Sequence, residues 1–347
     1  MAFGMKKLFT GVLFLLISVS SFGQTPEWKV GMFHFFDNTE FLYSNYTSDQ
    51  TMAGMRLQPE VGFHFENNHQ IWVGLDALKT YGDKKFIDEV SSTASYQFKD
   101  KHTSFQMGRF AKGHLLDDYS RAFFQDSFMY YRPNITGFHI QWKGSGCSVS
   151  TFLDWTGKID STAHEAFLIG VSAKYKKNWF VSEVQATMFH YAGSLSQPGV
   201  RENALLHPSV GIETGKIGFI DALDCRAGLL LGMERNRLQS MDMFYRSGLL
   251  FELNAVWNRL NLKTSSYLGE GIMKDYATMG SRLYWGDPFY QGESYHRLDL
   301  NYSFLKSKFV QAHAGFSTHF SENRVYAEQT LLVRVNLQSK GLRNGKK

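Results

Sequence analysis

Hydrophobic and polar residues alternate with a period of two along most of the chain, in segments of roughly ten residues. The alternation is clearest in 51–66 and recurs in 166–176, 245–257 and 323–337. In the first of these segments one face carries Ala53, Met55, Leu57, Val61, Phe63 and Phe65. A period of two is typical of β-strands with one apolar face, and little helical periodicity accompanies it.

The connections between these segments alternate in length. Short polar turns are predicted near 66–69, 99–102, 144–146, 176–178, 214–217, 258–259 and 305–308. Longer loops are predicted near 37–50, 82–91, 111–133, 157–164, 192–203, 235–241, 269–293 and 321–323. The pattern predicts an all-β fold of about 16 antiparallel strands, within a range of about 14 to 18. No linker or change of composition divides residues 24–337, so we expect a single domain there.

A membrane barrel explains the length of these segments better than a soluble sandwich does. Strands of soluble sandwiches average five or six residues, whereas a tilted strand needs roughly nine to eleven to cross a bilayer. Lipid also leaves open sheet edges unsatisfied, so a sheet that spans a membrane closes on itself. The sequence therefore predicts a closed transmembrane β-barrel.

Tryptophans lie beside the short turns. Trp72, Trp142, Trp179 and Trp257 each precede or follow one of them. Indole rings favour the interface between lipid and water, so we expect these four to form an aromatic belt at the end of the barrel with the short turns. The alternative is that aromatic residues simply favour strands.

The two ends of the chain differ from its body. Residues 1–23 combine Lys6 and Lys7, an apolar stretch and a small-x-small motif, which predicts a secretory signal peptide. Residues 338–347 form a basic tail. The formal net charge of +5 comes from these ends, so the body is nearly neutral and nucleic acid is not an expected partner. Two cysteines make neither a disulfide framework nor a CxxC motif.

Taken as a whole, the alternating segments of 24–337 resemble bacterial outer-membrane β-barrel proteins, and more loosely the 16-stranded porins. The resemblance implies a location in the outer membrane of a Gram-negative bacterium, with short periplasmic turns and long outer loops. It also implies that the third outer loop, 111–133, folds into the barrel and narrows it. The chain departs from the porin pattern because its last strand ends near Leu337, without a terminal aromatic residue, and a basic tail follows.

The third long loop is the strongest candidate for a binding site, since it combines charged and aromatic residues. The predicted constriction residues are Lys112, His114, Asp117, Asp118, Arg121, Asp126, Tyr130 and Arg132. Their charges suit hydroxyl groups, and neighbouring rings such as Tyr119, Phe124 and Phe128 suit the apolar faces of sugars. Alternatively, this loop packs on its own aromatic residues. A second aromatic loop, 275–295, could be a gate, a partner surface or a self-packed cap.

The predicted inner faces of the strands carry both signs of charge. The lumen-wall candidates are Arg56, Glu60, Arg226, Arg246, Glu252 and Arg334. In a water-filled lumen such groups set the electric field along the pore. An ion-pair network that keeps the barrel round is an equally good interpretation of each residue.

Enzymatic motifs are weak. The twelve histidines include no HxxxH or HExxH pair, so the sequence indicates neither a metal site nor a cofactor, and no catalytic residue is predicted. A barrel hydrolase would need a histidine near the outer rim, where His114 or His190 could lie. No GxSxG motif supports that reading, so we expect the chain not to be an enzyme.

The sequence therefore predicts a porin-like channel for passive diffusion of small polar solutes such as sugars, constricted by 111–133. The expected partners are membrane lipids and these solutes, with a homotrimer or a larger outer-membrane complex as possible assemblies. One alternative is a non-conducting barrel subunit of an uptake, secretion or assembly complex. Two further alternatives are a barrel hydrolase and a secreted soluble β-protein.

Overall fold

The computed structural model describes residues 26–339 except 67, 117–118 and 197–198. The predicted signal peptide and most of the predicted basic tail lie outside these residues. The strands are β1 (Pro26–Glu40), β2 (Gln50–Phe65), β3 (His69–Thr80), β4 (Glu89–Lys99), β5 (Thr103–Ala111), β6 (Asn134–Lys143), β7 (Cys147–Gly157), β8 (Ala166–Lys177), β9 (Phe180–Ala192), β10 (Val200–Thr214), β11 (Ala222–Asn236), β12 (Phe244–Trp257), β13 (Leu260–Gly269), β14 (Ser294–Lys306), β15 (Val310–Ser321) and β16 (Arg324–Gln338).

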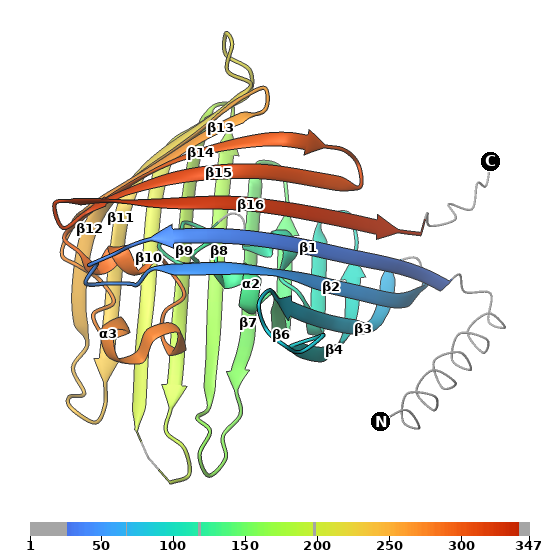
Figure 1. Cartoon of the computed structure of the whole chain (residues 1–347), viewed down its shortest axis with the longest axis horizontal. Coiled ribbons are helices and arrows are strands. Elements are labelled where there is room, and N and C mark those ends of the chain that lie inside the picture. The colour runs from blue at the N-terminus through green and yellow to red at the C-terminus, as the bar shows by residue number, and fades with distance from the viewer. Residues whose placement is uncertain (1–25, 67, 117–118, 197–198, 340–347) are drawn as a thin grey trace.

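Each strand pairs antiparallel with its neighbours in sequence, and β1 pairs with β16 to close a barrel (Figure 1). The closing ladder runs from Lys29 opposite Gln338 to Glu40 opposite Ala327. Closure pairs the first strand with the last, so the sheet has no free edge strand, which is what a hydrocarbon environment requires. The structure confirms the predicted all-β antiparallel barrel of about 16 strands.

Alternate residues of each strand face outward and inward, as β14 illustrates. Leu298 and Leu300 expose 43% and 49% of their surface on the outer face, where lipid would surround them. Arg297 precedes Leu298, and Asp299 lies between the two leucines; both charged residues are buried inside the barrel. This alternation confirms that the apolar face points outward and the charged face inward, the reverse of a soluble barrel.

Connections at both ends of the barrel differ from the prediction. The connection expected as a longer loop near 321–323 is a two-residue turn, in which Glu322 and Asn323 both have positive φ angles of 54° and 58°. This is the geometry of a tight hairpin, and asparagine tolerates it well. The turn predicted at 214–217 extends to residue 221 before β11 begins.

The aromatic belt is confirmed for three of its four predicted members. Trp142, Trp179 and Trp257 are 46%, 60% and 53% exposed. The prediction for Trp72 is wrong, because this residue points into the barrel, is 6% exposed and lies under the ammonium of Lys29. The period of two in β3 places Trp72 opposite to the outward Val73 and Leu75, which proximity to a turn could not indicate.

The two longest loops contain the helical turns. The loop after β5 carries η1 (Gly113–Leu115) and α2 (Phe128–Tyr131), and the loop after β13 carries α3 (Tyr276–Met279), η2 (Gly280–Arg282) and η3 (Pro288–Gln291). Figure 1 shows α2 behind the front strands β1 and β2. Among the described residues, no helix is long and apolar enough to cross a membrane.

Candidate functional site

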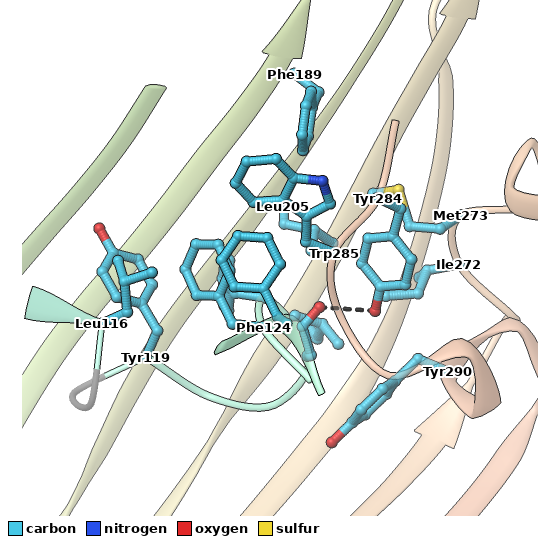
Figure 2. Packing of buried hydrophobic residues seen from close by; sticks show 14 of the residues in the cluster. Leu116, Tyr119, Phe124, Phe189, Leu205, Ile272, Met273, Tyr284, Trp285 and Tyr290 are labelled. Atoms are coloured by element: carbon cyan, nitrogen blue, oxygen red, sulfur yellow. Dashed lines mark hydrogen bonds between the residues drawn. The ribbon is translucent and has the colours of Figure 1, made fainter. Parts of the chain in front are cut away.

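The two longest loops meet inside the barrel and form its hydrophobic core (Figure 2). The Trp285 ring lies 4.1 Å from that of Phe128 and 4.8 Å, edge to face, from that of Phe189 on β9. The Tyr284 hydroxyl donates a 2.7 Å hydrogen bond to the carbonyl of Ala122. We call residues 112–133 and 270–293 together the plug.

The aromatic residues of the plug are not available to stack on a solute. Tyr119, Phe124 and Phe128 are less than 10% exposed and belong to one buried cluster with Trp285 and Tyr290. Residues of 111–133 pack both on one another and on aromatic residues of 275–295, such as Trp285 and Tyr290. Burial raises the pKa of Tyr284 and Tyr290 above the ordinary value, so both phenols stay neutral.

A charge network fixes the plug to the barrel wall. Arg297 on β14 contacts carboxylates of both loops and of the wall: Asp126 (2.8 Å), Asp287 (3.5 Å), Asp299 (2.6 Å) and Glu328 (3.1 Å). Arg121 adds ion pairs to Asp126 and Asp299, at 3.0 and 2.7 Å. Each carboxylate in this buried network thus has a guanidinium partner, as buried charge requires.

The electrostatics of the loop residues follow from these contacts. Burial alone would raise the pKa of Asp126, but Arg121 and Arg297 outweigh it and hold the pKa below its usual value. Lys112 shows the opposite balance, since burial lowers its pKa to about 8 even though Asp154 lies 2.9 Å away. Lys112 also donates hydrogen bonds to the carbonyls of Arg132 and Asn134, at 2.9 and 2.6 Å.

The predicted constriction residues do not form one site: four of them fall into two pairs, and the others lie elsewhere or outside the described residues. Arg121 and Asp126 belong to the charge network, whereas Lys112 and Arg132 lie near Trp285 toward the outer side. Tyr130 stacks on Phe35 with a ring separation of 4.6 Å. His114 lies in η1, and nothing is described for its side chain. Asp117 and Asp118 lie outside the described residues.

The predicted lumen-wall residues mostly form ion pairs. Arg56 pairs with Asp76 at 2.9 Å, and Glu60 pairs with Lys29 at 2.8 Å. Arg226 contacts Glu183, Glu213 and Asp224. Glu252 approaches His207 at 3.9 Å, and the guanidinium of Arg334 lies 4.4 Å from the Phe33 ring. Arg246 lies on the inner face of β12, but no ion pair within the described residues involves it.

A cavity of about 730 Å³ lies under the plug, on the side of the short turns. Its lining combines Arg121 and Asp126 of the plug with wall residues of both signs, including Lys174, Glu213, Arg226 and Glu252. The barrel interior is thus a charged vestibule that ends at a packed aromatic plug.

The outer face of the barrel carries a second polar site, at the ends of β16, β1 and β2. A groove of about 920 Å³ lies there, which we call the rim groove. Its lining residues are Asn38, Thr39, Glu40, Leu42, Tyr43, Asp49, Gln50, Thr51, Arg324, Val325 and Tyr326. Asn38 lies directly opposite Thr51 on β2 and Gln329 on β16, so the three share the outward face.

Hydrogen bonds connect the polar groups of the rim groove. The Thr51 hydroxyl donates to Oδ1 of Asn38 at 2.7 Å, and Nδ2 of Asn38 donates to Glu40 at 3.2 Å and to Gln329 at 2.6 Å. Directly below on the same face lie Phe36 and Leu331, which begin the apolar belt. The rim groove therefore places a hydroxyl, an amide and a carboxylate just above the depth of the hydrocarbon.

The sequence does not indicate the rim groove, because the pattern predicts a loop over 37–50. β1 in fact continues to Glu40. A signal is present: the outward row of β1 runs Trp28, Val30, Met32, His34 and Phe36, and becomes polar at Asn38 and Glu40. This change marks the outer boundary of the belt and its first polar groups.

His190, a hydrolase candidate, also faces outward at the rim. Its ring stacks on Phe167 at 4.8 Å, and its Nδ1 lies 3.8 Å from Glu202. Glu202 is already bound by Arg235 and Arg237, which makes it a weak base for His190. Within the described part of the chain, no three histidine, cysteine or acidic side chains gather as a metal site would require.

The architecture and the outward apolar face define an outer-membrane β-barrel, and comparison with solved structures agrees. Similar folds include OmpTdeltaL8, a loop L8 deletion mutant of OmpT from Vibrio cholerae (TM-score 0.54, 8% identity, covering 90% of this chain and 99% of that one). OccK9 (OpdG) of Pseudomonas aeruginosa has a TM-score of 0.52 at 10% identity, covering 90% and 98%. At such identities the likeness concerns the fold alone.

The sequence narrows the class further. The profile of the lipid A 3'-O-deacylase-type family matches residues 25–339, so the chain belongs to this family. No curated protein matches the chain. Family and fold together confirm the predicted outer-membrane barrel of a Gram-negative bacterium.

The expectation that the chain is not an enzyme is wrong, because the family is defined by an enzyme activity. The expectation rested on the absence of short catalytic motifs. In a barrel, residues from different strands assemble a site through register rather than through spacing along the chain, so no compact motif is needed.

Proposed function

We propose that the protein is a membrane-embedded ester hydrolase that removes an acyl chain from a glycolipid of the lipid A type in the outer leaflet. The observation that carries this proposal is the rim groove, in which Thr51, Asn38 and Glu40 are hydrogen-bonded on the lipid-facing side. Family membership supports the same reaction class. An acylated lipid reaches this groove laterally, without entering the lumen.

In the proposed reaction, Glu40 accepts a proton from a water molecule as its oxygen adds to the ester carbonyl. The Thr51 hydroxyl donates to the carbonyl oxygen as negative charge develops there. Collapse of the intermediate breaks the bond to the sugar oxygen, which takes up the proton that Glu40 removed from water, so a fatty acid and a free sugar hydroxyl result and the Glu40 carboxylate is regenerated. Asn38 is a positioning residue, because it holds both Glu40 and Thr51.

The test uses the purified full-length barrel in vesicles containing lipid A, with mass spectrometry of the lipid and of released fatty acid. We expect release by the wild type and its loss in Glu40→Gln. The matched control is Glu66→Gln, at a short turn on the opposite end, where the carboxylate is 82% exposed. His190→Gln tests the second outward cluster. Equal activity of Glu40→Gln and wild type would contradict the assignment of the rim groove.

A second candidate function is passive diffusion of small polar solutes past loop 111–133. The charged cavity of about 730 Å³ under the plug favours it, because its lining suits hydrated solutes. The plug opposes it, since aromatic packing closes the outer side. Conductance in planar bilayers tests this function, and deletion of 113–130 should increase the current if this loop is the constriction.

A further inference from the structure

Two glycines face each other across the β5–β6 hairpin and bend it. Gly108 lies opposite Gly137, with φ angles of +119° and +157°. A Cβ atom at Gly108 would lie 2.2 Å from the carbonyl oxygen of Ala94, and one at Gly137 would lie 2.1 Å from that of Leu153. Only glycine permits this approach to both neighbouring strands.

Beyond these glycines, the hairpin leaves the barrel wall. The β4–β5 ladder ends at Ala94 opposite Arg109, although β4 continues outward to Glu89 beside β3. The β6–β7 ladder ends at Gly137 opposite Asp154, where the Asp154 carboxylate accepts the Thr136 N–H at 2.8 Å. The wall therefore has an opening at the outer ends of β5 and β6, which we call the notch.

A cavity of about 590 Å³ fills the notch, and its lining comes from both faces of the wall. Val90 and Trp155 contribute from the outer face, where they are 57% and 43% exposed. Arg56 and Lys112 contribute from the buried interior, where they are 5% and 1% exposed. The cavity thus connects the outer surface of the barrel with charged groups inside.

Once the ion pairs of the notch are set aside, its lining keeps one more cation than anion. Arg56 is neutralised by Asp76, and Lys112 by Asp154. Of the acidic residues near the mouth, Asp88 pairs with Lys79, which leaves Glu89. Arg109 and Arg132 have no carboxylate partner among the residues that the structure describes.

The guanidinium of Arg109 is held in place but not fully hydrogen-bonded, and that of Arg132 is exposed beside it. Arg109 donates to the Ser91 hydroxyl at 3.0 Å, and its buried Nε has no hydrogen-bond partner within the described structure. The guanidinium of Arg132 lies 5.3 Å from the Trp285 ring, which orients it without neutralising it. The unpaired Arg109 donor in a partly buried cavity, with a second guanidinium at its side, favours an anion that accepts several hydrogen bonds.

We propose that the notch is a binding site for a phosphate monoester, held by Arg109 and Arg132 beside Lys112. Guanidinium groups match the geometry of phosphate oxygens, and the ion pair of Lys112 with Asp154 leaves the two arginines as the groups that bind the anion. The outward mouth admits a phosphate on a lipid headgroup as well as a free phosphate. This site is separate from the rim groove, and its occupancy does not depend on hydrolysis.

The first experiment uses the wild-type barrel in detergent and an arginine-specific reagent, phenylglyoxal. Labelling of Arg109 and Arg132 is measured by mass spectrometry with chloride, with inorganic phosphate, or with micelles of phosphatidic acid or phosphatidylcholine. We expect protection by phosphate and stronger protection by phosphatidic acid, but none by phosphatidylcholine. Absence of protection by both phosphate compounds would overturn the site. Protection by inorganic phosphate alone would overturn the lipid as its source.

The second experiment removes the two charges. In the double variant Arg109→Gln with Arg132→Gln, the affinity for phosphate, measured by calorimetry, should fall by about tenfold or more. Arg259→Gln, at a short turn on the other end of the barrel, is the matched control and should bind as the wild type does. Unchanged affinity in a folded double variant would overturn the proposal, and the labelling experiment covers a variant that does not fold.

Discussion

The ring of Phe128 lies 4.1 Å from that of Trp285, although 156 residues of chain separate them. This contact joins the two loops that fill the barrel, and Lys112 caps both rings at 4.6 and 5.1 Å. The plug therefore has a hydrophobic core of its own, and its stability can be tested apart from that of the barrel wall.

Trp285→Ala should destabilise the plug by about 3 to 5 kcal/mol, because it leaves a large cavity against Phe128 and Phe189. We expect a lower denaturant midpoint in vesicles and larger single-channel conductance. Trp257→Ala removes an exposed indole at the membrane interface and is the control. Equal conductance of the two variants would show that the Trp285 packing does not close the barrel.

Arg297→Met should free the loops from the wall. The variant leaves Asp126, Asp299 and Glu328 with fewer cationic partners in a buried site, which is expected to cost about 3 to 5 kcal/mol. Limited proteolysis within 111–133 should become faster. Arg246→Met removes an inward arginine without an ion pair among the described residues, and the same cleavage rate in both variants would contradict the prediction.

Stability should rise with pH above about 8 because of Lys112. Burial lowers its pKa in the folded protein to about 8, from an ordinary value of 10.5, so between these values the unfolded chain binds the extra proton. Stability then increases by at most about 1.4 kcal/mol per pH unit across this window. The measurement is the difference in unfolding free energy between wild type and Lys112→Met at pH 7.5 to 9.5. A difference that stays constant with pH would refute the shift.

Thr51→Val should lower the rate of the proposed hydrolysis by about 10² to 10³, the usual effect of losing one oxyanion donor. Valine keeps the shape of the side chain, and Thr51 packs no core, so the barrel should fold normally. Thr162→Val, in the loop before β8, is the control. A higher KM with an unchanged kcat would instead show that Thr51 contributes to binding only and would contradict its role as an oxyanion donor.

Gly137→Ala should destabilise the barrel by about 1 to 3 kcal/mol, because its φ angle disfavours a side chain and the new Cβ meets the carbonyl of Leu153. Gly215→Ala is a matched control, since a Cβ there meets nothing within 4 Å. Denaturant midpoints of the two variants compare the sites directly. The same midpoint for both would show that the hairpin tolerates a side chain at its bend.

The strand pattern could be predicted because it is local. Alternation with a period of two and the turns between segments determine which residues face lipid, as the outward Leu298 and Leu300 show. The same alternation correctly predicts that wall residues such as Arg56 and Arg226 face inward. The prediction for Trp72 is wrong because the position of a residue within its strand, and not its closeness to a turn, decides which face it takes.

The interior and the polar sites could not be predicted, because they depend on contacts between distant segments. Nothing local indicates that Tyr284 reaches Ala122, or that Arg297 gathers acids from two loops. The rim groove requires the register of the ladder between β1 and β16, which pairs the first described residues with the last. Sequence spacing alone carries no information about that register.

Closure of the ring between Lys29 and Glu40 on one side and 327–338 on the other has a consequence for biogenesis. The two strands that close the ring are the first and the last of the barrel, so the ring can close only after β16 has been made. A chain that ends before β16 would therefore keep two unpaired strand edges, on β1 and on β15, and could not complete the barrel.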